Sequence, residues 1–136
     1  SLIFANIGRK LKLHGGGHSI RSFIHIEDCV EAIRKIALNG VPGETYHIST
    51  RDTISIHDLV EKICDLTATP FEDLVEVTEE LLGKDQAYLL DSSKVRKELD
   101  WKDQITLEKG LLDTMNWVYD NIDVLQQQSD TYIHKP

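Results

Sequence analysis

The most informative segment of this sequence is Arg21-Ser22-Phe23-Ile24-His25-Ile26-Glu27-Asp28. It follows the glycine run Gly15–Gly17, where the backbone can approach a ligand closely because glycine has no side chain. The β-branched Ile24 and Ile26 favour a strand over residues 22–26. Two acidic residues come next, and such residues suit the N-terminal turn of a helix. The segment therefore predicts an arginine at the mouth of a short strand, followed directly by a helix.

Helical spacing of apolar residues predicts a helix from about residue 27 to residue 38, which the Asn-Gly pair at 39–40 ends. A Pro-Gly turn then leads into residues 45–49, which we expect to form a buried strand. Upstream, residues 2–11 have near-helical spacing and are expected to be the end of a helix.

The second half continues this alternation of helices and strands. Ser55 is expected to cap a helix over residues 56–67. The later elements are expected to be a strand at 74–78, a short strand at 88–90, a helix that Asp91 or Ser92 caps and that runs to about residue 99, and a long helix from Thr106. This order predicts an α/β fold with one folded portion, residues 1–125, and a polar C-terminal tail, residues 126–136.

Composition limits the class of protein. The chain has 136 residues, 40% of them hydrophobic, and a net charge of −8, as in an ordinary globular protein. No apolar run reaches the roughly 20 residues that cross a bilayer, so we expect no membrane contact. Cysteines that are expected to be reduced suit a cytoplasmic protein. Residues 1–40 carry +3 and the remainder −11. The acidic body disfavours nucleic acid, whereas the positive segment beside the glycine turn suits a small anionic ligand or is simply a solvated helix end.

Cysteines and histidines do not follow a metal-binding pattern. Cys29 and Cys64 are far apart inside predicted helices, which favours reduced, half-buried thiols over a disulfide. His25, His47 and His57 match no zinc spacing. We therefore expect structural or surface histidines and no metal site.

Five segments, in order, resemble the extended short-chain dehydrogenases/reductases that act on nucleotide sugars, the NAD-dependent epimerases and dehydratases. Residues 21–28 resemble the family pattern R-D-[YFW]-[IL]-[HY]-V-x-D. The other similar segments are G-E-T-Y-H-I at 43–48, T-I-S-I-H-D-L-V at 53–60, G-K-D-Q-A-Y-L-L-D-S-S-K at 83–94, and E-L-D-W at 98–101 with L-E-K-G-L at 107–111. Residues 83–94 and the ending Y-I-H-K-P look most like relatives of dTDP-glucose 4,6-dehydratase.

The resemblance implies that the chain is the C-terminal, substrate-binding portion of such an enzyme, with the N-terminal Rossmann domain missing. The intact parent would bind NAD and act on a nucleotide-diphosphate sugar, either as a 4,6-dehydratase (a lyase) or as a 4-epimerase (an isomerase). Residues 45–49 would pair with the sheet of the missing domain. Alone, the chain is expected to expose unpaired backbone and apolar helix faces, and therefore to self-associate.

The resemblance also assigns substrate contacts. Arg21 stands where the family's arginine grips the substrate diphosphate, a role that suits the donor fork of a guanidinium. Leu13, His14 and Gly15 match the family's L-x-[YH]-G-x-G, whose backbone passes close to the pyrimidine base. Lys84 is expected to contribute a further positive charge. The alternatives are a surface salt bridge for Arg21 and a plain flexible turn for the glycines.

Three positions depart from the family pattern. Leu81 stands where a second phosphate-binding arginine is expected, and the lysine at 84 replaces it only in part because it lacks the bidentate fork. Ser22 and His47 replace an aspartate and an asparagine. These departures predict weaker or altered substrate binding.

The cofactor and catalytic motifs of the family are not found in this sequence. Gly15–Gly17 is not a nucleotide-binding fingerprint, because no long buried strand precedes it and no helix opens from it. None of the four tyrosines has a lysine four residues later, so the Tyr-x-x-x-Lys pair that moves a proton is missing. We expect no catalytic or cofactor-binding residues here, and no catalysis by this chain alone. The alternative is a non-catalytic module that binds a sugar nucleotide or a protein partner.

Overall fold

The computed structural model describes residues 1–80, 83 and 85–128. Its helices are α1 (Leu2–Ile7), the 3₁₀ turn η1 (Gly15–Gly17), α2 (Ile26–Asn39), α3 (Ile56–Thr67), α4 (Phe71–Leu74), α5 (Ser93–Glu98) and α6 (Leu107–Leu125). Its strands are β1 (Leu11–His14), β2 (Ile20–Arg21), β3 (Ile54–Ser55), β4 (Val75–Thr78) and β5 (Ala87–Tyr88). The mixture of helices and strands confirms the α/β class.

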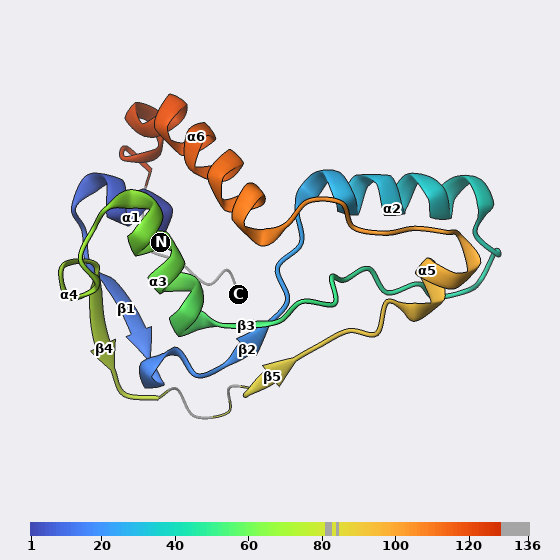
Figure 1. Cartoon of the computed structure of the whole chain (residues 1–136), viewed down its shortest axis with the longest axis horizontal. Helices are drawn as coiled ribbons and strands as arrows, with labels where there is room; N and C mark the ends of the chain where they lie inside the picture. Colours follow the sequence, from blue (N-terminus) through green and yellow to red (C-terminus); the bar gives the residue numbers. More distant parts are fainter. Residues whose placement is uncertain (81–82, 84, 129–136) are drawn as a thin grey trace, which may run out of the picture.

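The strands form two small sheets, which lie low in the view of Figure 1. Strands β1 and β4 are parallel, with Leu11 opposite Val75. In the second sheet β2 is central, antiparallel to β3 and parallel to β5. Arg21 therefore has a strand on each side, since it lies opposite Ile54 and Tyr88.

Two hydrophobic clusters hold the molecule together, toward opposite ends of its long axis (Figure 1). The first joins α1, α3, α4 and α6 to β1 and β4 through the buried residues Leu2, Leu13, Val60, Ile63, Cys64, Leu74, Val75 and Val118. The second packs α2 against α5 and the loop that follows it, around Ala32, Val95 and Trp101. The indole of Trp101 is 1% exposed and donates a hydrogen bond to the Asp28 carbonyl at 3.1 Å.

Side-chain caps determine where the three longest helices begin. At the start of α3, the Ser55 hydroxyl accepts a hydrogen bond from the Asp58 backbone N–H at 3.0 Å. At the start of α6, the Thr106 hydroxyl accepts one from the Lys109 backbone N–H at 3.3 Å. Both predicted starts are confirmed. The His25 ring caps α2 by accepting from the Glu27 N–H at 3.3 Å, so this helix begins at residue 26, one residue earlier than predicted.

Three predicted elements are wrong in extent. Residues 45–49 form no strand, because no segment among the described residues pairs with their backbone. The strand predicted at 22–26 is instead β2, Ile20–Arg21, since the following residues lead into the cap of α2. The helix predicted to residue 11 ends at Ile7, where Gly8 adopts the left-handed conformation (φ 66°) that ends helices.

Several smaller features follow the sequence closely. Strand β4 differs from its predicted start by one residue, and α6 begins directly after Thr106. Cys29 is a half-buried and Cys64 a buried free thiol. Within the part of the chain that the structure describes, every helix is too short or too polar to cross a bilayer.

Candidate functional site

Arg21 lies half-buried in the central strand β2, where its guanidinium reaches two backbone carbonyls. Its Nη1 donates to the Ile20 carbonyl at 2.7 Å, and its Nη2 donates to the Asp85 carbonyl at 2.8 Å. A guanidinium has five N–H donors, so part of the fork remains available to a ligand. The arrangement holds a fixed positive charge beside β5.

The three other described site residues lie at the end of β1 and the start of η1. Leu13 is 3% exposed and its side chain belongs to the first hydrophobic cluster, so only its backbone is open to contact. His14 Nδ1 is 2.8 Å from the Thr78 hydroxyl of the paired strand β4. Gly15 has a φ of 57°, and a Cβ here would collide with the Glu80 carboxylate. A carboxylate thus covers the glycine that was predicted to lie near the base.

The need for glycine at position 17 comes from packing. Gly17 is buried with a φ of 74°, and a Cβ would lie 2.8 Å from the His57 backbone nitrogen. The turn η1 therefore packs directly on the first turn of α3, which only glycine permits. This fixes the end of β1 relative to β2.

The structure brings the predicted residues onto neighbouring segments without linking them directly. No hydrogen bond or ion pair among the described residues joins the Arg21 side chain to residues 13–15. Leu81 and Lys84 lie outside the described residues, so the second phosphate contact stays a prediction. The Ile20 N–H donates to the Gln86 carbonyl at 2.7 Å, which holds the residue before β5 against β2 beside Arg21.

Sequence reasoning missed a buried carboxylate that organises the connection to α6. Asp28 is 5% exposed, and its two oxygens accept from the backbone N–H groups of Gln104 at 2.9 Å and Ile105 at 3.0 Å. The signal was available, because Asp28 shares the buried face of α2 with Ala32 and Ile36, four and eight residues on. An ionisable residue on that face is expected to be paired.

A second polar contact ties α5 to the loop before β3. Arg96 Nη2 lies 2.8 Å from the Asp103 carboxylate and donates to the Ser49 carbonyl at 2.9 Å. The guanidinium also stacks over the Trp101 ring, 4.8 Å from its centroid. Burial acts to raise the pKa of Asp103, but hydrogen bonds from Thr50 and Arg96 outweigh it and lower that pKa.

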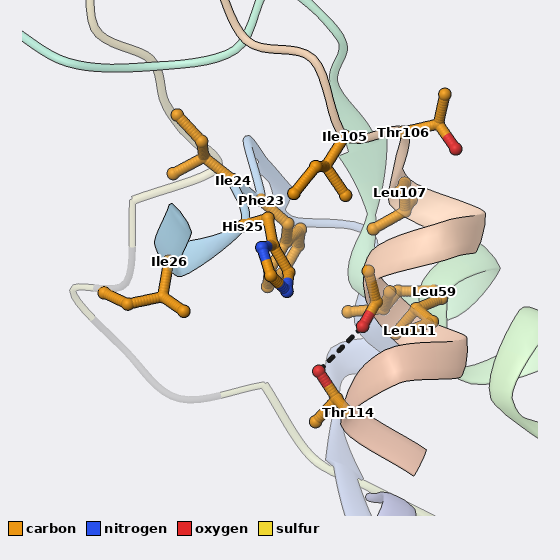
Figure 2. Close-up of a pocket in the computed structure, with 11 residues that line it drawn as sticks. Phe23, Ile24, His25, Ile26, Leu59, Ile105, Thr106, Leu107, Leu111 and Thr114 are labelled. Carbon is orange, nitrogen blue, oxygen red and sulfur yellow. Dashed lines mark hydrogen bonds between the residues drawn. The ribbon is translucent and has the colours of Figure 1, made fainter. Parts of the chain in front are cut away.

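A cavity of about 350 Å³ opens between the N-terminal ends of α2 and α6 and the side of α3 (Figure 2). Its lining is mainly apolar and comprises Phe23, Ile24, His25, Ile26, Leu59, Ile105, Thr106, Leu107, Gly110, Leu111 and Thr114. The Thr114 hydroxyl is occupied, because it donates to the Gly110 carbonyl at 2.7 Å. We call this cavity the α2–α6 pocket.

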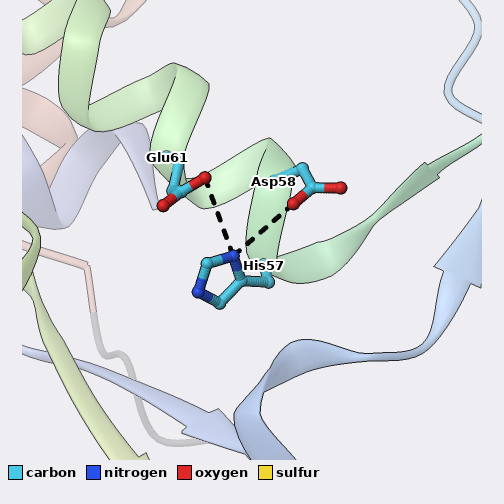
Figure 3. A group of neighbouring side chains, drawn as sticks. All are labelled: His57, Asp58 and Glu61. Atoms are coloured by element: carbon cyan, nitrogen blue, oxygen red, sulfur yellow. Dashed lines mark ion pairs between the residues drawn. The ribbon is translucent and has the colours of Figure 1, made fainter.

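A histidine and two carboxylates meet on the first turns of α3 (Figure 3). The His57 Nδ1 lies 3.5 Å from Asp58 and 3.8 Å from Glu61, and both carboxylates are exposed. His57 also contacts the Phe71 ring, with centroids 5.1 Å apart. Exposed carboxylates in the first turns of a helix suit its positive N-terminal end, which accounts for this group.

Comparisons with known proteins agree with this architecture. The sequence model of the family described as GDP-mannose 4,6 dehydratase matches residues 2–114. The dTDP-glucose 4,6-dehydratase of Escherichia coli is 32% identical over an alignment 139 positions long, which covers 95% of this chain and 38% of that enzyme. The crystal structure of the Bacillus anthracis dTDP-glucose 4,6-dehydratase in complex with NAD has a TM-score of 0.82 at 30% identity. It matches 90% of this chain and 38% of that one.

The DesIV dTDP-glucose 4,6-dehydratase of Streptomyces venezuelae, solved with NAD and TYD bound, gives a TM-score of 0.85 at 26% identity and matches the same shares of the two chains. The fold is thus that of a part of a short-chain dehydrogenase/reductase-type enzyme, and the chain spans about 38% of the length of these relatives. It belongs to the NAD-dependent epimerase/dehydratase family and is a relative of dTDP-glucose 4,6-dehydratase.

Proposed function

We propose that this chain is the substrate-binding portion of an NAD-dependent nucleotide-sugar 4,6-dehydratase or 4-epimerase. In this proposal Arg21 meets the diphosphate, while the backbone of residues 13–15 lies beside the base and Lys84 adds charge. The remainder of the parent enzyme supplies NAD and the catalytic groups. The observation that carries the proposal is the half-buried Arg21 fork, held by two carbonyls in a strand that has neighbours on both sides.

Two features of the site are expected to leave the diphosphate with fewer favourable contacts than in relatives. The Glu80 carboxylate lies against Gly15 and repels an anion there until it turns away. Leu81 replaces the second arginine of the family pattern. Both leave Arg21 as the main described source of directed N–H donors for phosphate oxygens.

The alternative is a non-catalytic module that binds a sugar nucleotide or a protein partner. A sugar-nucleotide module would use the same site, so only an assay for turnover distinguishes it from the enzyme. Calorimetric titration of the full-length protein with dTDP-glucose and with UDP-glucose, followed by a product assay with NAD, separates the two. Binding with 4-keto-6-deoxy product or C4 epimer supports the enzyme. Binding without turnover supports the module, and no binding of either nucleotide sugar contradicts the proposal.

A further inference from the structure

The Glu80 carboxylate lies against the glycine turn η1 without a partner in the described protein. A Cβ built on Gly15 would lie 2.9 Å from its Oε1 and closer still to its Oε2, so the carboxylate lies directly against the backbone at Gly15. Within the part of the chain that the structure describes, no hydrogen bond or ion pair involves this carboxylate, and the Glu80 side chain is exposed. Two acceptor oxygens are therefore open to a ligand beside the turn.

Strand pairing accounts for the position of Glu80. Strands β1 and β4 run parallel in register up to His14 and Thr78, and His14 Nδ1 lies 2.8 Å from the Thr78 hydroxyl. Gly15 directly follows His14, and Glu80 comes two residues after Thr78. The shared end of the two strands thus brings this carboxylate to the turn.

The charges at the two ends of the segment from Gly15 to Arg21 differ in sign. The Arg21 guanidinium offers N–H donors on β2, whereas Glu80 places a carboxylate at Gly15. A diphosphate is attracted to the guanidinium and repelled by the carboxylate. The neutral base of the same nucleotide is not repelled in this way. Together the two charges favour one orientation of a nucleotide, with its diphosphate at Arg21 and its base at Glu80.

A carboxylate accepts hydrogen bonds and donates none, so it distinguishes bases by the donors on their edges. Uracil and thymine have a ring N3–H, and guanine has a ring N1–H beside an amino group. In cytosine and adenine the corresponding ring nitrogen is an unprotonated acceptor, which a carboxylate repels. The bond from a ring N–H to a carboxylate is charge-assisted and therefore of the stronger kind.

The hydroxyl groups of the ribose are the other donors of a nucleotide. The turn favours the base over the ribose, because its backbone at Gly15 has no Cβ and can approach a flat ring closely. The carboxylate lies against this same part of the backbone and can meet the edge of that ring.

We infer, on the basis of the function proposed above, that the Glu80 carboxylate contacts the base of the nucleotide sugar and selects bases with a ring N–H. The selected bases are uracil, thymine and guanine. Cytosine and adenine are disfavoured at the same position.

Calorimetric titration of the full-length protein with UDP-glucose and with CDP-glucose tests this inference, because these ligands differ only in the base. The unmodified protein is expected to bind UDP-glucose at least about tenfold more tightly, the scale of one hydrogen bond to a charged group. Glu80→Gln should reduce this preference to about threefold or less, because an amide both donates and accepts. Glu79→Gln removes the same charge from the neighbouring exposed side chain, and this matched control should keep the full preference.

Three results would overturn the inference and leave the proposed function standing. The first is equal affinity of the unmodified protein for UDP-glucose and CDP-glucose. The second is a loss of affinity by the same factor for both ligands in Glu80→Gln, which would indicate a contact with the ribose. The third is a preference that Glu79→Gln reduces as much as Glu80→Gln does. No binding of dTDP-glucose, UDP-glucose or CDP-glucose would contradict the proposed function, and this inference with it.

Discussion

The guanidinium of Arg21 donates to the backbone carbonyl of Asp85 at 2.8 Å, across 64 residues of sequence. This contact joins the segment that resembles the family's diphosphate-binding arginine to the segment that resembles its second phosphate loop. Two regions identified separately from sequence are therefore neighbours in space. Because a carbonyl is a neutral acceptor, a diphosphate can displace it and gain the stronger, charge-assisted bond.

Asp28 is predicted to be the most sensitive polar residue of the fold. Asp28→Ala leaves the partly buried N–H groups of Gln104 and Ile105 without their carboxylate acceptor and is expected to lower the free energy of unfolding by about 1–3 kcal/mol. Asp28→Asn keeps one acceptor oxygen and should cost about half as much. Urea denaturation measures both, with the exposed substitution Asp120→Ala as control. A loss below about 0.5 kcal/mol for Asp28→Ala would show that this carboxylate does not hold the connection to α6.

The ion pair between Arg96 and Asp103 predicts a loss of stability in acid. Since the pKa of Asp103 is lowered in the folded state, its contribution is present above the unfolded value of about 3.9 and is lost as the pH falls through the lower, folded value. Asp103→Asn should reduce the free energy of unfolding by about 1–3 kcal/mol at pH 7. The difference between the two proteins should shrink below about pH 4. A difference that stays constant from pH 7 to pH 3 would exclude this pair as a source of acid sensitivity.

Backbone strain at Ala68 offers a stabilising substitution. Ala68 ends α3 in the left-handed conformation with a φ of 50°, where a Cβ is unfavourable. Ala68→Gly is expected to raise the free energy of unfolding by about 0.5–1 kcal/mol, the net of relieved strain and greater freedom of the unfolded chain. Asp100, with a φ of 45°, should gain less on replacement by glycine because aspartate tolerates this conformation better. Thermal denaturation compares the two variants, and destabilisation by Ala68→Gly would contradict this explanation.

Local signals predicted the helices well because their causes lie within a few residues of sequence. Ser55 and Thr106 cap their own helices, and no distant contact is needed to place them. The strand at 45–49 was predicted from composition and resemblance, but a strand also requires a partner, and none is present among the described residues. The length of β2 likewise depends on competition with the His25 cap of α2.

The candidate site was predictable only in part, because some of its contacts come from residues that are distant in sequence. The resemblance identified Arg21 and the glycine turn, whereas the Asp85 carbonyl and the Glu80 carboxylate reach them from segments more than 60 residues away. Local sequence patterns do not predict contacts between residues that are so far apart in sequence. The burial of the Leu13 side chain also depends on tertiary structure, because residues of α3 and of the neighbouring strand β4 join it in the first hydrophobic cluster.

The central claim is that Arg21 binds the diphosphate of a nucleotide sugar, and calorimetric titration of full-length Arg21 variants tests it most directly. Arg21→Ala should weaken binding by roughly 2–3 kcal/mol, the scale of charge-assisted hydrogen bonds in a partly shielded site. Arg21→Lys should recover only part of this, because lysine keeps the charge but loses the fork. Arg51→Ala, at an exposed arginine outside the predicted site, is the control. Unchanged affinity for the nucleotide sugar in Arg21→Ala, with an unchanged melting temperature, would make Arg21 a surface residue and contradict the claim.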